Sequence, residues 1–346
     1  MMRKNLLLAS LYSFMAFYLH AQHFDKVATV ATNNERSSRT AGLIDINQDG
    51  LVDIFFTNGD QTASEIYLNQ GEGVFQLSSD RAINSTGLRA VGANWIDVEN
   101  DGDLDMYVTT WGTGTKNYLF LNGPDGLEID QSSILNITNF SEAAGWADYN
   151  SDGYLDAIVA NSNSGVNLFF TNNGDGTFRS ISINGSGGDS RCASWADWDN
   201  DGDQDLIVTN EAHDVYAYLN GPDGLSASLD LFPDKTYTAF GASWGDMDND
   251  GDLDLFLARF SAPNVLLEND NGVFTEVPSS GLSENNHPAI GSSWGDIDND
   301  GDLDLIVTNG FVLRMYQLSF LLITETRLLQ RLNQRSSYPR WDHIMA

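Results

Sequence analysis

A nine-residue acidic segment occurs six times in this chain of 346 residues, and it constrains the fold more than any other feature. Each copy has Asp at positions 1, 5 and 9, an acidic residue or Asn at position 3, and Gly at position 6. Successive copies begin 52, 51, 49, 49 and 50 residues apart, at Asp45, Asp97, Asp148, Asp197, Asp246 and Asp296. A period of this length is typical of the blades of a β-propeller, in which each repeat is one small sheet.

The sequence around each segment repeats as well. A Trp stands two residues before the first Asp in five copies, and Leu43 takes that place in the first; the tryptophans are Trp95, Trp146, Trp195, Trp244 and Trp294. The stretch that contains the Trp is the first of four runs in each unit, and a short apolar run after the acidic segment is the second. A third run follows, and a Gly-rich turn then leads to the fourth, as at 173–178. Their length and β-branched content favour strands. Each unit is therefore predicted to hold four short strands, with the acidic segment as a loop between the first and second.

Four-stranded units of this kind cannot bury both faces alone, and packing them radially as blades solves this problem. We therefore predict an all-β fold, a β-propeller of four-stranded blades, over residues 22–310. The tryptophans are expected to be buried in or beside the interfaces between blades. Residues 24–27 are similar to the fourth strand at 274–277, so they are expected to complete the last blade and close the ring.

The first 21 residues have the order of a secretory signal peptide. Arg3 and Lys4 precede an apolar run over 6–19, and Ala21 offers a small residue for cleavage. The run is short for a membrane span. We expect a secreted or cell-surface protein with a signal peptide at 1–21 and no transmembrane segment after cleavage; the alternative is an uncleaved N-terminal anchor.

The acidity of the chain is concentrated in the repeated segments, which hold 26 of its 49 acidic residues. Only 17 basic residues oppose them, so the formal net charge of −32 argues against nucleic acid as a partner. The Gly at position 6 allows a sharp backbone reversal, so the side chains at positions 1, 3, 5 and 9 can converge. Oxygen ligands in this number suit Ca²⁺ better than Mg²⁺, which needs a tighter octahedral site. The alternative is an exposed Asp/Gly turn without metal.

Other calcium-binding loops do not fit the pattern. An EF-hand needs a Glu at position 12 and flanking helices, whereas position 12 here is apolar: Phe56, Val108, Val159, Val208, Leu257 and Val307. Thrombospondin-type repeats need cysteines, and this chain has only Cys192, which also excludes an internal disulfide. The ligand set is therefore expected to end at position 9, with a backbone carbonyl contributed by position 7.

The repeated units of this chain resemble those of a known protein family. The run Phe240-Gly-Ala-Ser-Trp-Gly-Asp246, the acidic segment after it and the later Asn-Gly-x-Phe turn are similar to the FG-GAP/VCBS repeats of integrin alpha-like β-propellers, over roughly residues 24–310. The resemblance implies a propeller, commonly seven-bladed, with calcium in the loop between the first two strands. This chain shows six loops, and the Gly-Ala-Pro element of the family is hardly present.

The resemblance also implies a set of side-chain calcium ligands for about six Ca²⁺ sites. Transferred position by position, they are Asp45, Asn47, Asp49 and Asp53; Asp97, Glu99, Asp101 and Asp105; Asp148, Asn150, Asp152 and Asp156; Asp197, Asp199, Asp201 and Asp205; Asp246, Asp248, Asp250 and Asp254; and Asp296, Asp298, Asp300 and Asp304.

The repeat pattern stops after Gly310. Residues 311–346 hold 5 of the 17 basic residues and only two acidic ones, and no third or fourth strand of the sixth unit is recognisable there. Suitable codons for 322–326, read in a shifted frame, give Asn-Asn-Gly-Asp, which is similar to the turn at Asn172. We therefore expect an incomplete last blade and a tail that is a frame-shifted or truncated repeat. The alternative is a helical tail, with an amphipathic face over 318–332.

For function, the sequence favours an interaction module over an enzyme. The five histidines are scattered, no Gly-x-Ser-x-Gly element occurs, and six repeated acidic loops are better explained as metal ligands than as catalytic pairs. We expect a secreted calcium-binding propeller for adhesion or protein interaction, with an extracellular protein or glycan as partner. The second hypothesis is a lectin-like propeller or a non-catalytic module of a polysaccharide-processing system, with Trp111 and Tyr216 as candidate sugar contacts. A polysaccharide lyase-like enzyme is the third.

Overall fold

In the computed structural model of the protein, the regular secondary structure is made of β-strands joined by turns and loops. The structure describes residues 38–59, 62–79, 88–183, 187–228, 231–232, 237–277, 288–297, 299–309, 317–322 and 330–332. These residues form six separate four-stranded sheets, and within these ranges there is no helix. The predicted signal peptide at 1–21 and the expected closing strand at 24–27 lie outside the described residues.

Each sheet is a simple antiparallel succession of strands in chain order. The first and second sheets contain β1 (Ser38–Ile44), β2 (Asp53–Asn58), β3 (Glu65–Asn69), β4 (Phe75–Leu77), β5 (Ala90–Ile96), β6 (Asp105–Thr110), β7 (Tyr118–Leu121) and β8 (Glu128–Ile129). The third and fourth contain β9 (Ser141–Ala147), β10 (Asp156–Asn161), β11 (Leu168–Asn172), β12 (Phe178–Ile181), β13 (Ser190–Ala196), β14 (Asp205–Asn210), β15 (Tyr216–Leu219) and β16 (Ser226–Ala227). The fifth and sixth contain β17 (Gly241–Gly245), β18 (Asp254–Ala258), β19 (Val265–Asp270), β20 (Val273–Glu276), β21 (Ala289–Gly295), β22 (Asp304–Asn309), β23 (Gln317–Leu322) and β24 (Gln330–Leu332).

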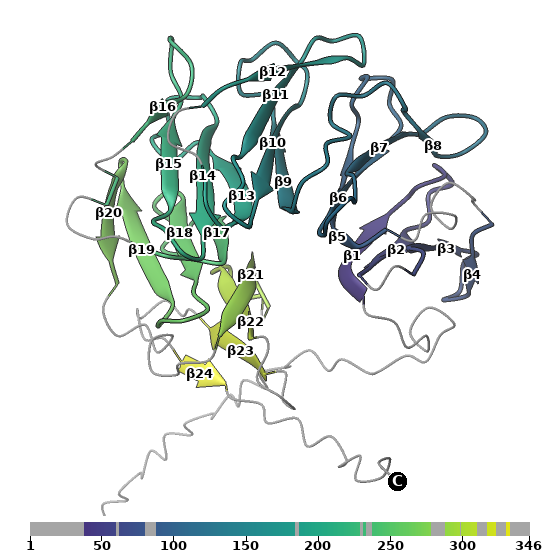
Figure 1. Cartoon of the computed structure of the whole chain (residues 1–346). Helices are drawn as coiled ribbons and strands as arrows, with labels where there is room; N and C mark the ends of the chain where they lie inside the picture. The colour runs from purple at the N-terminus through teal and green to yellow at the C-terminus, as the bar shows by residue number, and fades with distance from the viewer. Residues whose placement is uncertain are drawn as a thin grey trace, which may run out of the picture.

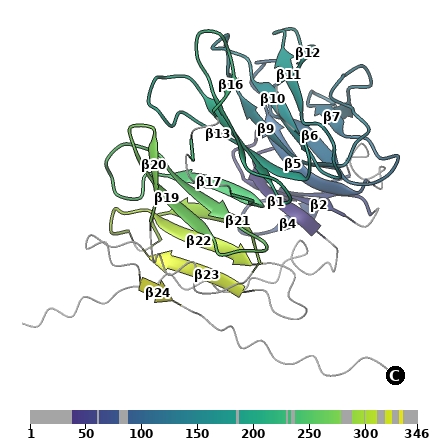
Figure 2. The same ribbon diagram turned by 60° about the vertical axis from the view of Figure 1, so that its left-hand side comes forward.

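The sheets follow one another around a common centre, as blades of a propeller do (Figures 1 and 2). The first strands β1, β5, β9, β13, β17 and β21 lie innermost and contact one another in that order, whereas the fourth strands lie at the rim. The six acidic segments are the loops between the first and second strands. The predicted four-stranded blades and the place of the acidic loop within them are therefore confirmed.

The sixth sheet corrects one part of the sequence prediction. The last blade was expected to lack its third and fourth strands, but β23 pairs with β22 (Leu305 opposite Leu321) and β24 pairs with β23 (Leu321 opposite Arg331). A helix over 318–332 is also wrong for the described parts of that range. The physical reason is that β22 offers unpaired backbone groups along its edge, which an apolar run can satisfy even without the Asn-Gly turn of the other units. The frame-shift hypothesis stays a prediction.

The hydrophobic core is divided into five clusters, each between two consecutive sheets. One cluster joins Phe55 and Ile66 of the first sheet to Met106 and Phe120 of the second, and the other junctions are built in the same way. The five repeated tryptophans pack against these clusters, one at each. Their indole nitrogens are enclosed and hydrogen-bond to no protein atom. The five side chains are half-buried, so the predicted place of the tryptophans beside the interfaces is confirmed, whereas their full burial is not.

Small residues on the first strands let neighbouring sheets approach one another. A Cβ atom on Gly245 would lie 2.7 Å from the ring of Trp294 on the next sheet, closer than van der Waals contact allows. We therefore expect Gly245→Val to lower the free energy of unfolding by about 1–3 kcal/mol through overpacking. Gly295 holds the same position in the sixth sheet and has no atom within 4 Å of its Cβ position. Urea unfolding of Gly295→Val provides the matched control, and an equal loss in the two variants would contradict this account of the contact.

Candidate metal centre

The first Asp of every acidic loop fixes the turn of the loop backbone. Its carboxylate accepts hydrogen bonds from the N–H groups of positions 5 and 6 in all six loops. In the fifth loop both of these bonds to Asp246 are 3.1 Å long. The carboxylate at position 5 in turn accepts the N–H of position 7. Each loop is thus folded around its own carboxylates.

Two residues of each loop have left-handed backbone conformations. Position 4 has φ between 54° and 60°, and the Gly at position 6 has φ between 86° and 99°. An L side chain at position 6 would be strained, which accounts for the invariable Gly of the repeat. Asn occupies position 4 in four of the six loops, which agrees with the tolerance of Asn for the left-handed region.

The Asp at position 9 is buried in every loop and is the first residue of the second strand. Asp254 has no exposed surface, and its carboxylate accepts the N–H of Met247 at 2.7 Å and the N–H of Asn269, on the third strand, at 2.8 Å. Desolvation on burial raises the pKa of Asp254, Asp205 and Asp156 to about 7 and that of Asp105 to about 6, even though backbone N–H groups act in the opposite direction. Four loops therefore bury a carboxylate whose charge is costly without a cation nearby.

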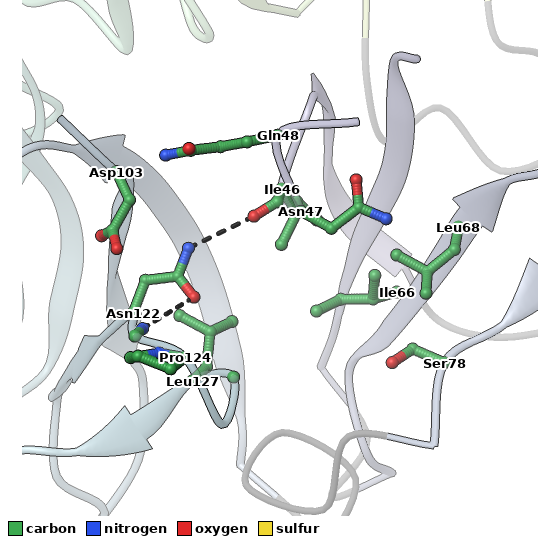
Figure 3. A pocket seen from close by; sticks show the side chains of 12 residues that line it. Ile46, Asn47, Gln48, Ile66, Leu68, Ser78, Asp103, Asn122, Pro124 and Leu127 are labelled. Carbon is green, nitrogen blue, oxygen red and sulfur yellow. Dashed lines mark hydrogen bonds between the residues drawn. The ribbon is translucent and has the colours of Figure 1, made fainter. Parts of the chain in front are cut away.

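The Asn at the end of the third strand links neighbouring loops. The amide of Asn122 donates to the carbonyl of Ile46, at position 2 of the preceding loop, at 3.2 Å (Figure 3). Equivalent bonds run from Asn172 to Val98, from Asn220 to Tyr149 and from Asn269 to Trp198. These Asn residues also donate their backbone N–H to position 9 of their own sheet. The sequence showed the repeated Asn, but sequence reasoning gave it no role.

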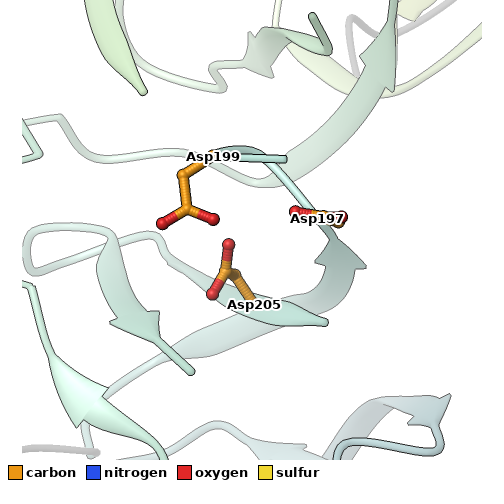
Figure 4. Close-up of side chains that lie close together, drawn as sticks. All are labelled: Asp197, Asp199 and Asp205. Carbon is orange, nitrogen blue, oxygen red and sulfur yellow. The ribbon is translucent and has the colours of Figure 1, made fainter. Parts of the chain in front are cut away.

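Carboxylates from positions 1, 3 and 9 converge in the fourth and fifth loops. Asp197, Asp199 and Asp205 each offer an oxygen, and these atoms all lie within 4.8 Å of one another (Figure 4). Asp246, Asp248 and Asp254 do the same in the fifth loop. Oxygen-only groups of this size are the kind that hard divalent cations such as Ca²⁺ prefer.

The remaining predicted ligands are placed differently. The carboxylates at position 5 are exposed in every loop and belong to neither three-carboxylate group. Asn47 and Asn150 stand at position 3 of the first and third loops, so neither loop can supply three carboxylates from positions 1, 3 and 9. Glu99 of the second loop is exposed and joins no such group among the described residues, and Asp298 lies outside them. Among the described residues, three acids therefore converge at two of the predicted sites, those of the fourth and fifth loops.

The fifth loop shows most plainly that these residues fit a cation. The Oδ1 atom of Asp248 is enclosed and hydrogen-bonds to no protein group. Desolvation raises the pKa of Asp248, and the nearby carboxylates of Asp250, Glu268 and Asp246 raise it further. Among the described residues, the chain supplies no basic side chain in an ion pair with this group. A divalent cation would satisfy the orphaned oxygen and remove the repulsion.

Side chains at position 4 connect the acidic loops in series. Gln48 donates to the Gly102 carbonyl and Asn100 to the Gly153 carbonyl, so the first three loops are joined. Asn200 donates to Asp252 at 2.6 Å, and Asn249 donates to Asp302 at 2.8 Å, so the last three are joined. Ser151, at position 4 of the third loop, makes no such bond to the fourth loop in the described part of the chain.

The bond from Asn200 leads to a stability prediction. Asp252 is largely buried, so removal of the donor leaves a carboxylate oxygen less well satisfied. We expect Asn200→Ala to reduce the free energy of unfolding by about 1.5–3 kcal/mol, the usual contribution of a hydrogen bond to a charged group. Ser151→Ala tests the same position where the bond is missing and should change stability by no more than a few tenths of a kcal/mol. Equal effects in chemical denaturation would show that the link does not stabilise the fold.

The fold and its loops define a β-propeller of four-stranded blades with acidic interstrand loops. Models of the FG-GAP-like repeat match residues 45–108, 148–208, 197–257 and 246–307, which together make up more than half of the chain. The chain belongs to the FG-GAP-like repeat family. No curated protein matches it in sequence.

Two solved structures share the fold at low sequence identity. One is a lectin from Agrocybe aegerita that recognises non-reducing terminal N-acetylglucosamine; it has a TM-score of 0.57 and 17% identity over 86% of this chain and 81% of the lectin. The other is BBS1N in complex with ARL6DN, with a TM-score of 0.51 and 13% identity over 87% of this chain and 84% of that one. In the described ranges, no helix is long and apolar enough to cross a membrane.

Proposed function

We propose that this protein is a secreted β-propeller whose acidic loops bind Ca²⁺ and which serves as an adhesion or protein-interaction module. The observation that carries the proposal is the convergence of Asp246, Asp248 and Asp254 on one another, with an enclosed oxygen of Asp248 that no protein group satisfies. Membership of the FG-GAP-like family and a fold shared with a binding protein support it.

The residues that would hold the ion are those at positions 1, 3 and 9, supplemented by position 5 and by a carbonyl at position 7. Bound calcium supplies a compact positive charge that offsets the mutual repulsion of the carboxylates. The chain's own contribution is orientation: backbone N–H groups hold both oxygens at position 1, and the second and third strands hold position 9. Each ion would fasten the innermost strands of one blade, which would stiffen the surfaces that meet a partner.

The interaction function can be tested by direct binding. The full chain, immobilised on beads, would be offered a panel of extracellular proteins and a glycan array, each in millimolar calcium and in chelator. We expect the immobilised chain to capture one or more proteins in calcium, and we expect chelator to abolish this capture. Capture that is confined to glycans would favour the lectin reading, and an absence of capture from both panels would contradict the proposal.

A lectin function is the second candidate because one similar fold belongs to a protein that recognises N-acetylglucosamine. Of the two aromatic residues predicted to contact sugar, Trp111 is 41% exposed, although its ring packs edge-on against Phe140 and its N–H donates to Ser162. Tyr216 is half-buried and its hydroxyl donates to the Gly187 carbonyl. Loss of glycan binding in Trp111→Ala would support this reading, and retention would exclude Trp111 as the contact. A depolymerisation assay with calcium tests the lyase-like alternative.

A further inference from the structure

A pocket of about 480 Å³ lies between the first and second sheets, beside the first acidic loop (Figure 3). Its floor is aliphatic, formed by Ile46, Ile66, Leu68 and Leu127. Its rim is polar and includes the side chains of Asn47 and Asp103, which come from two consecutive acidic loops. The pocket is thus built by two blades together, and the function proposed above assigns no role to its aliphatic floor.

Three of the other four junctions place an aromatic ring at one or more of the equivalent positions, whereas the junction between the fifth and sixth sheets has Met247 and Leu266 in place of Ile46 and Ile66. Between the third and fourth sheets, Tyr149 replaces Ile46 and Phe169 replaces Ile66, and the two rings meet with centroids 4.8 Å apart. The turn that faces them is the same in both junctions, because Asn-Gly-Pro-Asp-Gly-Leu occurs at 122–127 and again at 220–225. The space at the first junction therefore corresponds in position to aromatic side chains that the chain supplies for itself elsewhere.

Two further junctions follow the same rule. Phe178 takes the place of Leu127 between the second and third sheets and is buried in the cluster with Val98. Between the fourth and fifth sheets, Trp198 takes the place of Ile46, and its ring is buried and stacks on that of Trp244. Among these four junctions, the first alone has aliphatic residues at all of these positions, and the pocket lies at this junction.

The rim adds a preference for polar and positive groups. Asp103 lines the pocket, and its enclosed Oδ1 atom hydrogen-bonds to no protein atom, so the rim carries a carboxylate that no protein donor satisfies at this oxygen. The amide of Asn47 is exposed at the pocket, and Figure 3 shows it above Ile66 and Leu68. The chain as a whole carries a formal charge of −32, which attracts a basic partner. An aromatic ring that ends in a hydroxyl matches an apolar floor with a polar rim.

We propose that the pocket between the first and second sheets binds an aromatic side chain, tyrosine foremost, from a basic segment of a partner protein. The proposal rests on the function as an interaction module and names the chemistry that one surface of the module recognises. Aromatic side chains that fill pockets are the usual anchors of protein interfaces. The volume exceeds that of one ring, so the residue next to the tyrosine also has room at the rim.

The test uses the full chain in calcium, with methyl-labelled Ile and Leu observed by NMR. The probes are N-acetyl-tyrosinamide and the capped dipeptides Lys-Tyr and Glu-Tyr. We expect each probe to shift the methyl signals of Ile46, Ile66 and Leu127, with Lys-Tyr binding about tenfold more tightly than Glu-Tyr, a difference of about 1.4 kcal/mol. Absence of shifts at these methyl groups with all three probes would overturn the proposal.

Two substitutions copied from the chain's own filled junctions close the pocket from opposite walls. Ile46→Tyr reproduces Tyr149, and Leu127→Phe reproduces Phe178; each should weaken Lys-Tyr binding by about tenfold or more. Tyr149→Phe, at the filled junction, should leave binding unchanged. Unchanged binding in both pocket variants, with folding verified by their amide spectra, would overturn the proposal, as would N-acetylglucosamine shifting these methyl signals while the tyrosine probes do not. Calcium-dependent melting of the same samples tests the metal function separately, so failure of the pocket and failure of the calcium sites are distinguishable.

Discussion

Replacing Asp254 by Ala is expected to lower the free energy of unfolding by about 2–5 kcal/mol. The substitution leaves the buried N–H groups of Met247 and Asn269 without their acceptor, and each unsatisfied buried donor costs about 1–3 kcal/mol. It also removes one of the three converging carboxylates of the fifth loop, so the stabilisation by calcium should decrease in the same variant. Urea unfolding with and without calcium measures both effects.

Asp223→Ala provides the control for this substitution. Asp223 is an exposed acid in the turn between β15 and β16 and belongs to no acidic loop, so its loss should change stability by no more than about 0.5 kcal/mol. If Asp254→Ala and Asp223→Ala proved equally stable, position 9 would not have the structural role assigned to it. If Asp254→Ala were destabilised but responded to calcium like the unmodified protein, the fifth loop would not be a binding site.

Calcium is expected to raise the midpoint of thermal unfolding substantially. Extracellular modules bind calcium with dissociation constants of about 10⁻⁴–10⁻³ M, so millimolar calcium would stabilise each occupied site by about 0.4–1.4 kcal/mol through mass action. Six sites would together contribute about 2–8 kcal/mol, which is comparable to the total stability of many domains. The measurement is a melting curve in calcium, in chelator and in magnesium at equal ionic strength. Identical midpoints in calcium and chelator would contradict calcium binding, and an equal shift with magnesium would contradict the preference for calcium.

The repeated pattern predicted most of the fold because the same residues mark the repeating unit, its strands and the interfaces between units. The spacing of the acidic segments gave the unit, the apolar runs gave its four strands, and the tryptophans marked the interfaces. The third and fourth strands of the sixth sheet were missed because 317–322 and 330–332 lack the turn residues and acidity of the other units. Pairing of those residues depends on the open edge of β22, which is a property of the folded sheet and not of the local sequence.

The candidate site was predictable in its residue types but not in its detailed geometry. Sequence reasoning treated positions 1, 3, 5 and 9 as equivalent, whereas positions 1, 3 and 9 converge in the fourth and fifth loops and position 5 is exposed. The role of the Asn at the end of the third strand, as in Asn269, depends on contacts between residues about 70 positions apart. The pocket at the first junction likewise depends on how side chains of the first sheet, such as Ile46, lie opposite side chains of the second, such as Leu127.

The central claim is that the acidic loops bind calcium, and titration of the metal-free full chain by isothermal calorimetry tests it most directly. We expect saturable binding of more than one Ca²⁺ per chain, up to about six, with dissociation constants of about 10⁻⁴–10⁻³ M. Asp199→Ala and Asp248→Ala should each remove about one site, because each deletes the position 3 ligand of a three-carboxylate group. No heat of binding, or a stoichiometry that neither substitution changes, would contradict the claim.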